Sequence, residues 1–133
     1  MNTVLFACVH NAGRSQMAAA LFNQLADPAK ARAVSAGTSP GDRVHPEVVT
    51  AMREVGIDLS NAKPRLLTPA LAGGAQALVT MGCGDACPVV PGVVPLDWPL
   101  PDPQGRPIEE VRSIRDAIRA RVVALLRERE WMA

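Results

Sequence analysis

The chain has 133 residues, 48% of them hydrophobic, which is enough to bury the core of one domain over residues 1–133. The formal net charge is only +1, so the composition predicts no general affinity for nucleic acids or for anionic membrane surfaces. No apolar run approaches the length of a membrane span or of a signal-peptide core, so we expect a cytoplasmic protein.

The first half of the chain alternates short apolar runs with amphipathic segments. Residues 4–7 and residues 31–36 are apolar runs that predict buried strands. Between them, apolar residues recur at helical spacing over residues 15–25, which predicts a helix. A second helix is predicted over residues 46–55, because a proline stands at its first turn and a glycine follows its last residue.

The second half continues the alternation. Residues 66–71 predict a short amphipathic piece, and residues 75–81 and 93–96 predict two more strands. The last helix is expected to start at Pro107, and its apolar stripe recurs at helical spacing. Alternating strands and helices predict an α/β fold with three layers, in which helices cover both faces of a parallel sheet.

One stretch, residues 8–15, joins the first strand to the first helix and reads Cys-Val-His-Asn-Ala-Gly-Arg-Ser. Such a loop points backbone N–H groups into one concavity, and the helix N-terminus adds partial positive charge. This arrangement predicts a nest for a tetrahedral oxyanion. The expected substrate-binding residues are Val9, His10, Asn11, Ala12, Gly13, Arg14 and Ser15.

Within this stretch Arg14 is expected to close the nest with its planar fork of donors, and Cys8 is expected to act as a nucleophilic thiolate. The alternative is a buried core cysteine with Arg14 merely capping nearby. His10 either adds positive charge or faces solvent. Ser15 donates to the Cys8 sulfur, serves as the helix N-cap, or does both. A hydrogen bond between Asn11 and Ser35, which lies in the second predicted strand, would hold the loop in place.

Two further cysteines, Cys83 and Cys87, follow the third predicted strand in a glycine-containing loop. Loops at the carboxyl edge of one sheet converge, so a second thiol near Cys8 suggests disulfide exchange. The pair can also bond to each other. The other interpretations are two inert cysteines or half of a zinc site, for which His10 and His45 are poorly spaced.

Asp102, in the loop after the fourth predicted strand, is the candidate general acid. The alternative is a turn aspartate, because Asp before Pro is common in turns. Asp97 is the competing carboxylate in the same loop.

Together these motifs resemble the low-molecular-weight protein tyrosine phosphatase family, and Cys83 and Cys87 resemble its arsenate reductase branch. The resemblance covers nearly the whole chain and implies a four-stranded parallel sheet flanked by helices. It also implies a role for each matching residue. The nucleophile is Cys8, the oxyanion binder Arg14, the thiolate stabiliser Ser15, the acid Asp102, and the residues that shape the cradle are Asn11 and Ser35.

The function implied by this resemblance is arsenate reduction through a Cys8 adduct, with a thiol/disulfide relay through Cys83 and Cys87. The expected partners are arsenate, with phosphate and sulfate as competing anions, and a reductant. That reductant is thioredoxin or a low-molecular-weight thiol with a mycoredoxin or glutaredoxin-type protein. We expect a monomer with no metal and no tightly bound cofactor.

Two other functions fit parts of the pattern. A phosphatase would use the same cradle and form a phosphocysteine that water resolves. However, the chain has no tyrosine, and Gln104-Gly105 follow the Asp-Pro pair where a phosphotyrosine pocket needs an aromatic wall. A non-catalytic module that binds anions or senses redox state would keep the cradle without needing a proton donor.

Overall fold

The computed structural model describes residues 1–82, 93 and 95–133 of the chain. Within these residues the sheet has four strands in the order β2-β1-β3-β4, and every neighbouring pair is parallel. The elements are β1 (Asn2–Cys8), α1 (Arg14–Leu25), β2 (Ala31–Gly37), α2 (Pro46–Arg53), α3 (Pro69–Gly73), β3 (Ala77–Thr80), β4 (Leu96–Asp97) and α4 (Ile108–Arg129). The predicted four-stranded parallel sheet is therefore confirmed.

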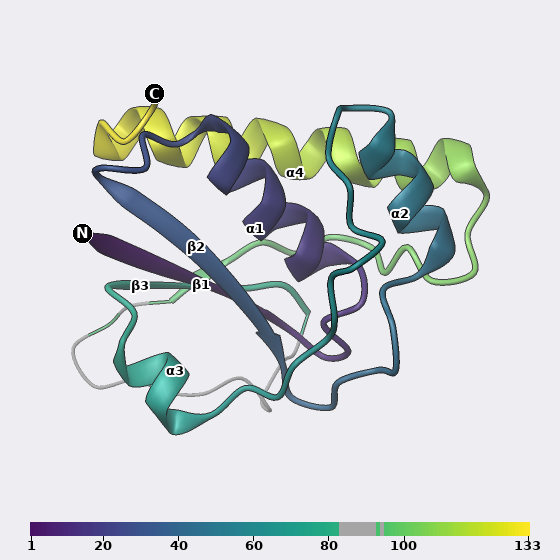
Figure 1. Cartoon of the computed structure of the whole chain (residues 1–133), viewed down its shortest axis with the longest axis horizontal. Helices are drawn as coiled ribbons and strands as arrows, with labels where there is room; N and C mark the ends of the chain where they lie inside the picture. The colour runs from purple at the N-terminus through teal and green to yellow at the C-terminus, as the bar shows by residue number, and fades with distance from the viewer. Residues whose placement is uncertain (83–92, 94) are drawn as a thin grey trace.

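Helices cover both faces of this sheet, as the alternation predicts (Figure 1). The larger core lies between one face and α1, α2 and α4, and its centre is Phe6 of β1, whose ring contacts Phe22 and Trp98. A smaller core on the other face packs Leu5 and Leu78 against α3. Because β1 is covered on both faces, its apolar run is continuous rather than alternating.

The helix ends follow their sequence signals only in part, since α2 ends at Arg53 and not at residue 55. Gly56, just beyond α2, has a left-handed φ of 82°, which favours glycine at a helix end. Pro107 is the N-cap of α4 rather than its first residue. The predicted piece at 66–71 divides in two, since Leu66 forms an isolated bridge with Gly37 and α3 begins only at Pro69.

The bounds of all four strands differ from those predicted: β1 and β2 extend beyond their predicted ranges, and the two strands of the second half differ more. The fourth is Leu96–Asp97 and not residues 93–96. It starts after Pro95, which has no N–H to donate to a strand ladder. The third is Ala77–Thr80 and not residues 75–81. These short strands end at the same edge of the sheet as β1, so the segments that follow them start from one edge.

An ion-pair cluster ties the end of α2 to α4. The Glu54 carboxylate accepts from Arg112 Nη2 at 2.6 Å and from Arg115 Nη1 at 2.9 Å. Arg115 Nη1 also donates to the Ala51 carbonyl oxygen at 2.8 Å. The hydrogen bond from Arg112 is the main cause that holds the pKa of Glu54 below its ordinary value of 4.5. Among the residues described, no helix is long and apolar enough to cross a membrane.

Because the pKa of Glu54 is lower in the folded state than its ordinary value, the ion-pair cluster stabilises the fold fully when the pH is above 4.5. This stabilisation is lost as the pH falls through the pKa that Glu54 has in the folded state. Glu54→Gln is therefore expected to lower the urea midpoint at about pH 7 and to have much less effect at about pH 3. Glu128→Gln on the exposed side of α4 is the matched control. An equal loss at both pH values would contradict the ion-pair explanation.

Candidate oxyanion-binding active site

The loop between β1 and α1 turns its carbonyl groups outward. Each of its six consecutive carbonyl oxygens, from Cys8 to Gly13, accepts a hydrogen bond from a donor outside the loop concavity. Four of these donors are backbone N–H groups that follow β2, at residues 38–45, and two come from the first turn of α1. The donors are, in order, Thr38 N, Ser39 N, Gly41 N, Gln16 Nε2, His45 N and Met17 N.

Because the carbonyls point outward, the loop amides are left to line its concave side, as an oxyanion cradle requires. The turn needs a left-handed residue, and Asn11 supplies it with a φ of 50°. Gly37 of β2 lies directly behind the loop, where a Cβ atom would come within 2.5 Å of the Val9 carbonyl oxygen and 2.9 Å of the Asn11 nitrogen. The cradle therefore depends on a glycine in the neighbouring strand.

Cys8 is 2% exposed and lies at the base of this cradle. Its Sγ atom is 2.8 Å from Ser15 Oγ and accepts from the Asn11 N–H at 3.3 Å. Asn11 Nδ2 donates to Ser15 Oγ at 2.7 Å, so the hydroxyl hydrogen is available to the sulfur. The N-cap of α1 is Gly13, which leaves the sulfur contact as the role of the Ser15 side chain.

The buried Asn11 is held by residues that the sequence reasoning missed. Its Oδ1 accepts from Gln16 Nε2 at 3.1 Å and from the Arg65 N–H at 3.0 Å. Arg65 Nε in turn donates to the Ser35 carbonyl oxygen at 3.0 Å. Ser35 thus connects to Asn11 through Arg65, by its backbone, in place of the direct contact that we expected. Of these two residues, only Gln16 could have been suspected from the sequence, because it directly follows the stretch 8–15, whereas Arg65 lies far from it in the chain.

Arg14 is mostly buried beside the cradle, and its side chain is 11% exposed. Nη1 donates to the Leu100 carbonyl oxygen at 3.0 Å, and Nη2 lies 3.9 Å from Asp102 Oδ2. Gly82 follows β3 with a φ of 93°, and a Cβ atom there would overlap Arg14 Nη1. Three segments that follow different strands therefore meet at this guanidinium.

Asp102, not Asp97, is the carboxylate at Arg14. The loop that carries it packs on the cradle, because a Cβ atom on Gly13 would lie 2.7 Å from Pro103 Cγ. Asp102 Oδ1 also accepts from the Gln104 N–H at 3.0 Å, so the turn interpretation of this residue holds as well. Asp97 is held in β4 by Thr80 Oγ1, which donates to its Oδ1 at 2.9 Å.

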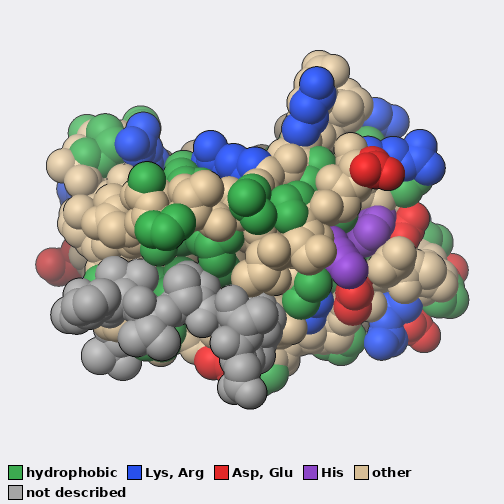
Figure 2. Space-filling view, turned by 90° about the horizontal axis from the view of Figure 1, so that it is seen from below, with side chains coloured by type: hydrophobic (Ala, Val, Ile, Leu, Met, Phe, Trp, Pro, Cys, Tyr) green, Lys and Arg blue, Asp and Glu red, His purple; other side chains and the backbone are tan. Residues whose placement is uncertain are grey.

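His10 is exposed and lines a cavity of about 310 Å³ beside the cradle. His45 and Gln104 line the same cavity, and the histidine side chains lie together on this face of the molecule (Figure 2). Cys83 and Cys87 lie outside the described residues. In the part of the chain that is described, no group of three His, Cys, Asp or Glu side chains is placed to hold a metal ion.

Comparison with known proteins shows to which family the chain is similar. The model of the low molecular weight phosphotyrosine protein phosphatase family matches residues 3–130. A Halobacterium salinarum protein is 41% identical over 129 residues, which cover 92% of this chain and 89% of that protein. The arsenate reductase of Staphylococcus aureus strain Newman is 38% identical over 122 residues, or 88% of this chain and 90% of that enzyme.

A solved structure, the Corynebacterium glutamicum thioredoxin-dependent arsenate reductase, superposes with a TM-score of 0.83 at 38% identity. The match covers 96% of this chain but only 61% of the other. An Archaeoglobus fulgidus arsenate reductase superposes with a TM-score of 0.78 at 31% identity, covering 92% of this chain and 98% of that one.

Gly37→Ala is expected to weaken the binding of inorganic phosphate by about tenfold or more, because the new methyl group displaces the Val9 carbonyl and the Asn11 amide. Gly41→Ala is the matched control, since a Cβ atom there meets nothing closer than 3.8 Å. Titration calorimetry measures both affinities, with circular dichroism to verify folding. Wild-type affinity in a folded Gly37→Ala protein would contradict the role of this glycine.

Proposed function

Because the chain belongs to the low molecular weight phosphotyrosine protein phosphatase family, we propose that it is an arsenate reductase that uses this scaffold for thiol redox chemistry. The relatives reported above that carry a functional name are arsenate reductases. The observation that carries the proposal is the contact of Gly82 with Arg14. Gly82, which directly precedes Cys83 in the sequence, thus lies against the arginine proposed to bind the anion, and a phosphatase mechanism has no role for the two cysteines that follow Gly82 in the chain.

In the first step the Cys8 thiolate attacks the arsenic of arsenate held by the loop amides and Arg14. A sulfur–arsenic bond forms and an arsenic–oxygen bond breaks, and Asp102 gives the proton with which the oxygen leaves as water. The Ser15 hydroxyl and the Asn11 amide, both within hydrogen-bonding distance of the sulfur, stabilise the attacking thiolate.

In the second step the Cys83 thiolate attacks the Cys8 sulfur. The sulfur–arsenic bond breaks, its electron pair stays on arsenic, and arsenic(V) becomes arsenic(III), which leaves as arsenite. Cys87 then attacks Cys83 and frees Cys8. The Cys83–Cys87 disulfide is reduced by two electrons from a dithiol protein or from low-molecular-weight thiols.

Thioredoxin is the favoured reductant, because the Corynebacterium glutamicum relative is described as thioredoxin-dependent. A low-molecular-weight thiol with a mycoredoxin or glutaredoxin-type protein is the alternative. We further propose that the enzyme works as a cytoplasmic monomer without a metal or a tightly bound cofactor. Phosphate and sulfate are expected to compete with arsenate, since the cradle recognises a tetrahedral oxyanion.

Phosphomonoester hydrolysis is the second candidate function, because the same nucleophile, arginine and acid serve it. The cavity next to the cradle is lined by polar and small residues, including His10, His45 and Gln104. Among its described lining residues there is no Phe, Tyr or Trp to stack on a phosphotyrosine ring. We therefore expect any hydrolysis of aryl phosphates to be a side activity.

Cys83→Ser is expected to stop repeated turnover of arsenate while leaving aryl-phosphate hydrolysis within about twofold, because water resolves a phosphocysteine but only a thiol releases arsenite. Cys8→Ser is the control that loses both activities. Arsenite release is measured with thioredoxin and with a glutaredoxin-type system in parallel. Disulfide mapping of Cys87→Ser after one turnover then identifies the relay by a trapped Cys8–Cys83 bond. Equal loss of both activities in Cys83→Ser would make Cys83 structural.

Asp102→Asn is expected to slow adduct formation by about a hundredfold and to leave phosphate affinity nearly intact, because it removes the proton donor and keeps the shape. Asp97→Asn is the matched control, since Asp97 is bound to Thr80 and not to Arg14. The rate at which enzyme thiols are lost on mixing with arsenate measures the step. A slow Asp97 variant beside a fast Asp102 variant would reverse the assignment.

A further inference from the structure

We propose that Arg106 is a positioning residue that holds the backbone of the general acid Asp102 over the cradle. Its Nε atom donates to the Asp102 carbonyl oxygen at 2.6 Å, and its Nη1 atom donates to Glu110 Oε2 at 3.0 Å. One guanidinium therefore links the peptide of the acid to the first turn of α4. The inference rests on the proposed function, because it assigns Asp102 its role in proton transfer.

The loop around Asp102 needs such a tie because it is poor in backbone donors. Prolines at positions 99, 101, 103 and 107 remove four N–H groups from the segment between β4 and α4. The Asp102 side chain is 48% exposed and lies 3.9 Å from Arg14, so that contact holds it only loosely. Among the described residues, the bond from Arg106 Nε is the shortest hydrogen bond that the loop makes.

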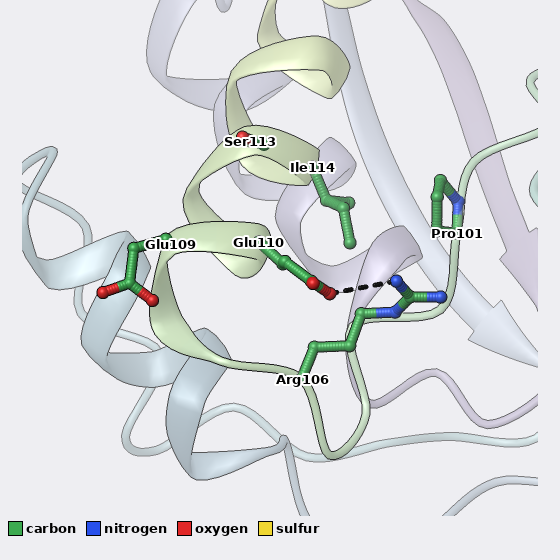
Figure 3. A pocket seen from close by; sticks show the side chains of 6 residues that line it. All are labelled: Pro101, Arg106, Glu109, Glu110, Ser113 and Ile114. Atoms are coloured by element: carbon green, nitrogen blue, oxygen red, sulfur yellow. Dashed lines mark hydrogen bonds and ion pairs between the residues drawn. The ribbon is translucent and has the colours of Figure 1, made fainter.

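The other end of the link is fixed to a rigid element. Helix α4 packs along its length into the larger core through residues such as Val111, Ile114 and Ile118. Figure 3 shows the Arg106 guanidinium between Glu110 of this helix and Pro101 of the loop, while Glu109 points away from it. The Gly105 N–H, which donates to Glu47 Oε1 at 3.2 Å, adds a tie from the same turn to α2.

The chemistry of the side chain suits this task. The Arg106 fork presents donors in one plane to two acceptors at once, whereas a lysine ammonium on a flexible stem does not fix their relative placement. The Arg106 and Glu110 side chains are 43% and 53% exposed, and an exposed ion pair of this kind contributes little to folding stability. Loss of Arg106 is therefore expected to affect the chemical step far more than the stability of the fold.

Arg112 of the same helix offers a matched control. Its side chain is also 43% exposed and pairs with a carboxylate, Glu54, but it contacts α2 and not the acid loop. We compare Arg106→Met and Arg112→Met, because methionine keeps the length of the stem and removes the donors. The assay follows the loss of enzyme thiols during the first turnover over a range of arsenate concentrations.

For Arg106→Met we expect the rate at saturating arsenate to fall roughly tenfold, a part of the roughly hundredfold loss expected when the acid itself is removed. The half-saturating arsenate concentration should stay within about twofold of the wild-type value. Arg112→Met should keep the wild-type rate. A merely structural role would instead lower the stability of the Arg106 variant and leave this rate unchanged.

The double variant separates this inference from the proposed function. If Arg106 acts through Asp102, Arg106→Met should slow the Asp102→Asn protein no further. A full additional loss in that background, or a wild-type rate in Arg106→Met while Asp102→Asn is slow, would overturn the role of Arg106 alone. A wild-type rate in Asp102→Asn would overturn the acid assignment and Arg106 with it. An absence of arsenate reduction in the unaltered protein would overturn the proposed function itself.

Discussion

The site depends on the hydrogen bonds that hold six consecutive carbonyl groups, from Cys8 to Gly13, pointing out of the loop that joins β1 to α1. A peptide unit directs its N–H opposite to its carbonyl, so fixing one side of the loop fixes the other. Most of the donors that achieve this are backbone N–H groups of the segment after β2, at residues 38–45. The cradle is thus shaped by its neighbours before any anion arrives, and little rearrangement is needed on binding.

The local part of this site was predictable. The run from Cys8 to Ser15 lies between a buried strand and an amphipathic helix, and its spacing together with this setting indicates a nucleophile beside an anion nest. The order of strands and helices also predicts the parallel sheet, because such strands need crossovers. These inferences depend on residues close together in the chain, where backbone geometry allows few arrangements.

The supporting contacts were not predictable in the same way. Arg65 reaches Asn11 across 54 positions, and the Leu100 carbonyl reaches Arg14 across 86. Both use backbone atoms, which every residue type carries, so no side-chain pattern marks them. The bounds of β4 were missed for a different reason: the predicted run 93–96 contains Pro95, whose missing N–H is a sequence signal that a strand ladder is interrupted there. Long-range backbone bonds are the part of this fold that composition and periodicity leave open.

A cradle lined by amide hydrogens and an arginine has a consequence for selectivity. Such a lining offers only donors, so it responds to the charge and shape of an anion and has little means of telling apart ions that share both. Arsenate and phosphate share them. Discrimination between the two ions then depends on the central atom. When a second thiol attacks the Cys8 sulfur, the electron pair of the sulfur–arsenic bond can stay on arsenic and reduce it, whereas phosphorus in the corresponding adduct is not reduced in this way. The protein then binds phosphate as well as arsenate, and the phosphate leaves unchanged. Abundant phosphate therefore slows arsenate reduction by occupying the site, but it is not itself reduced.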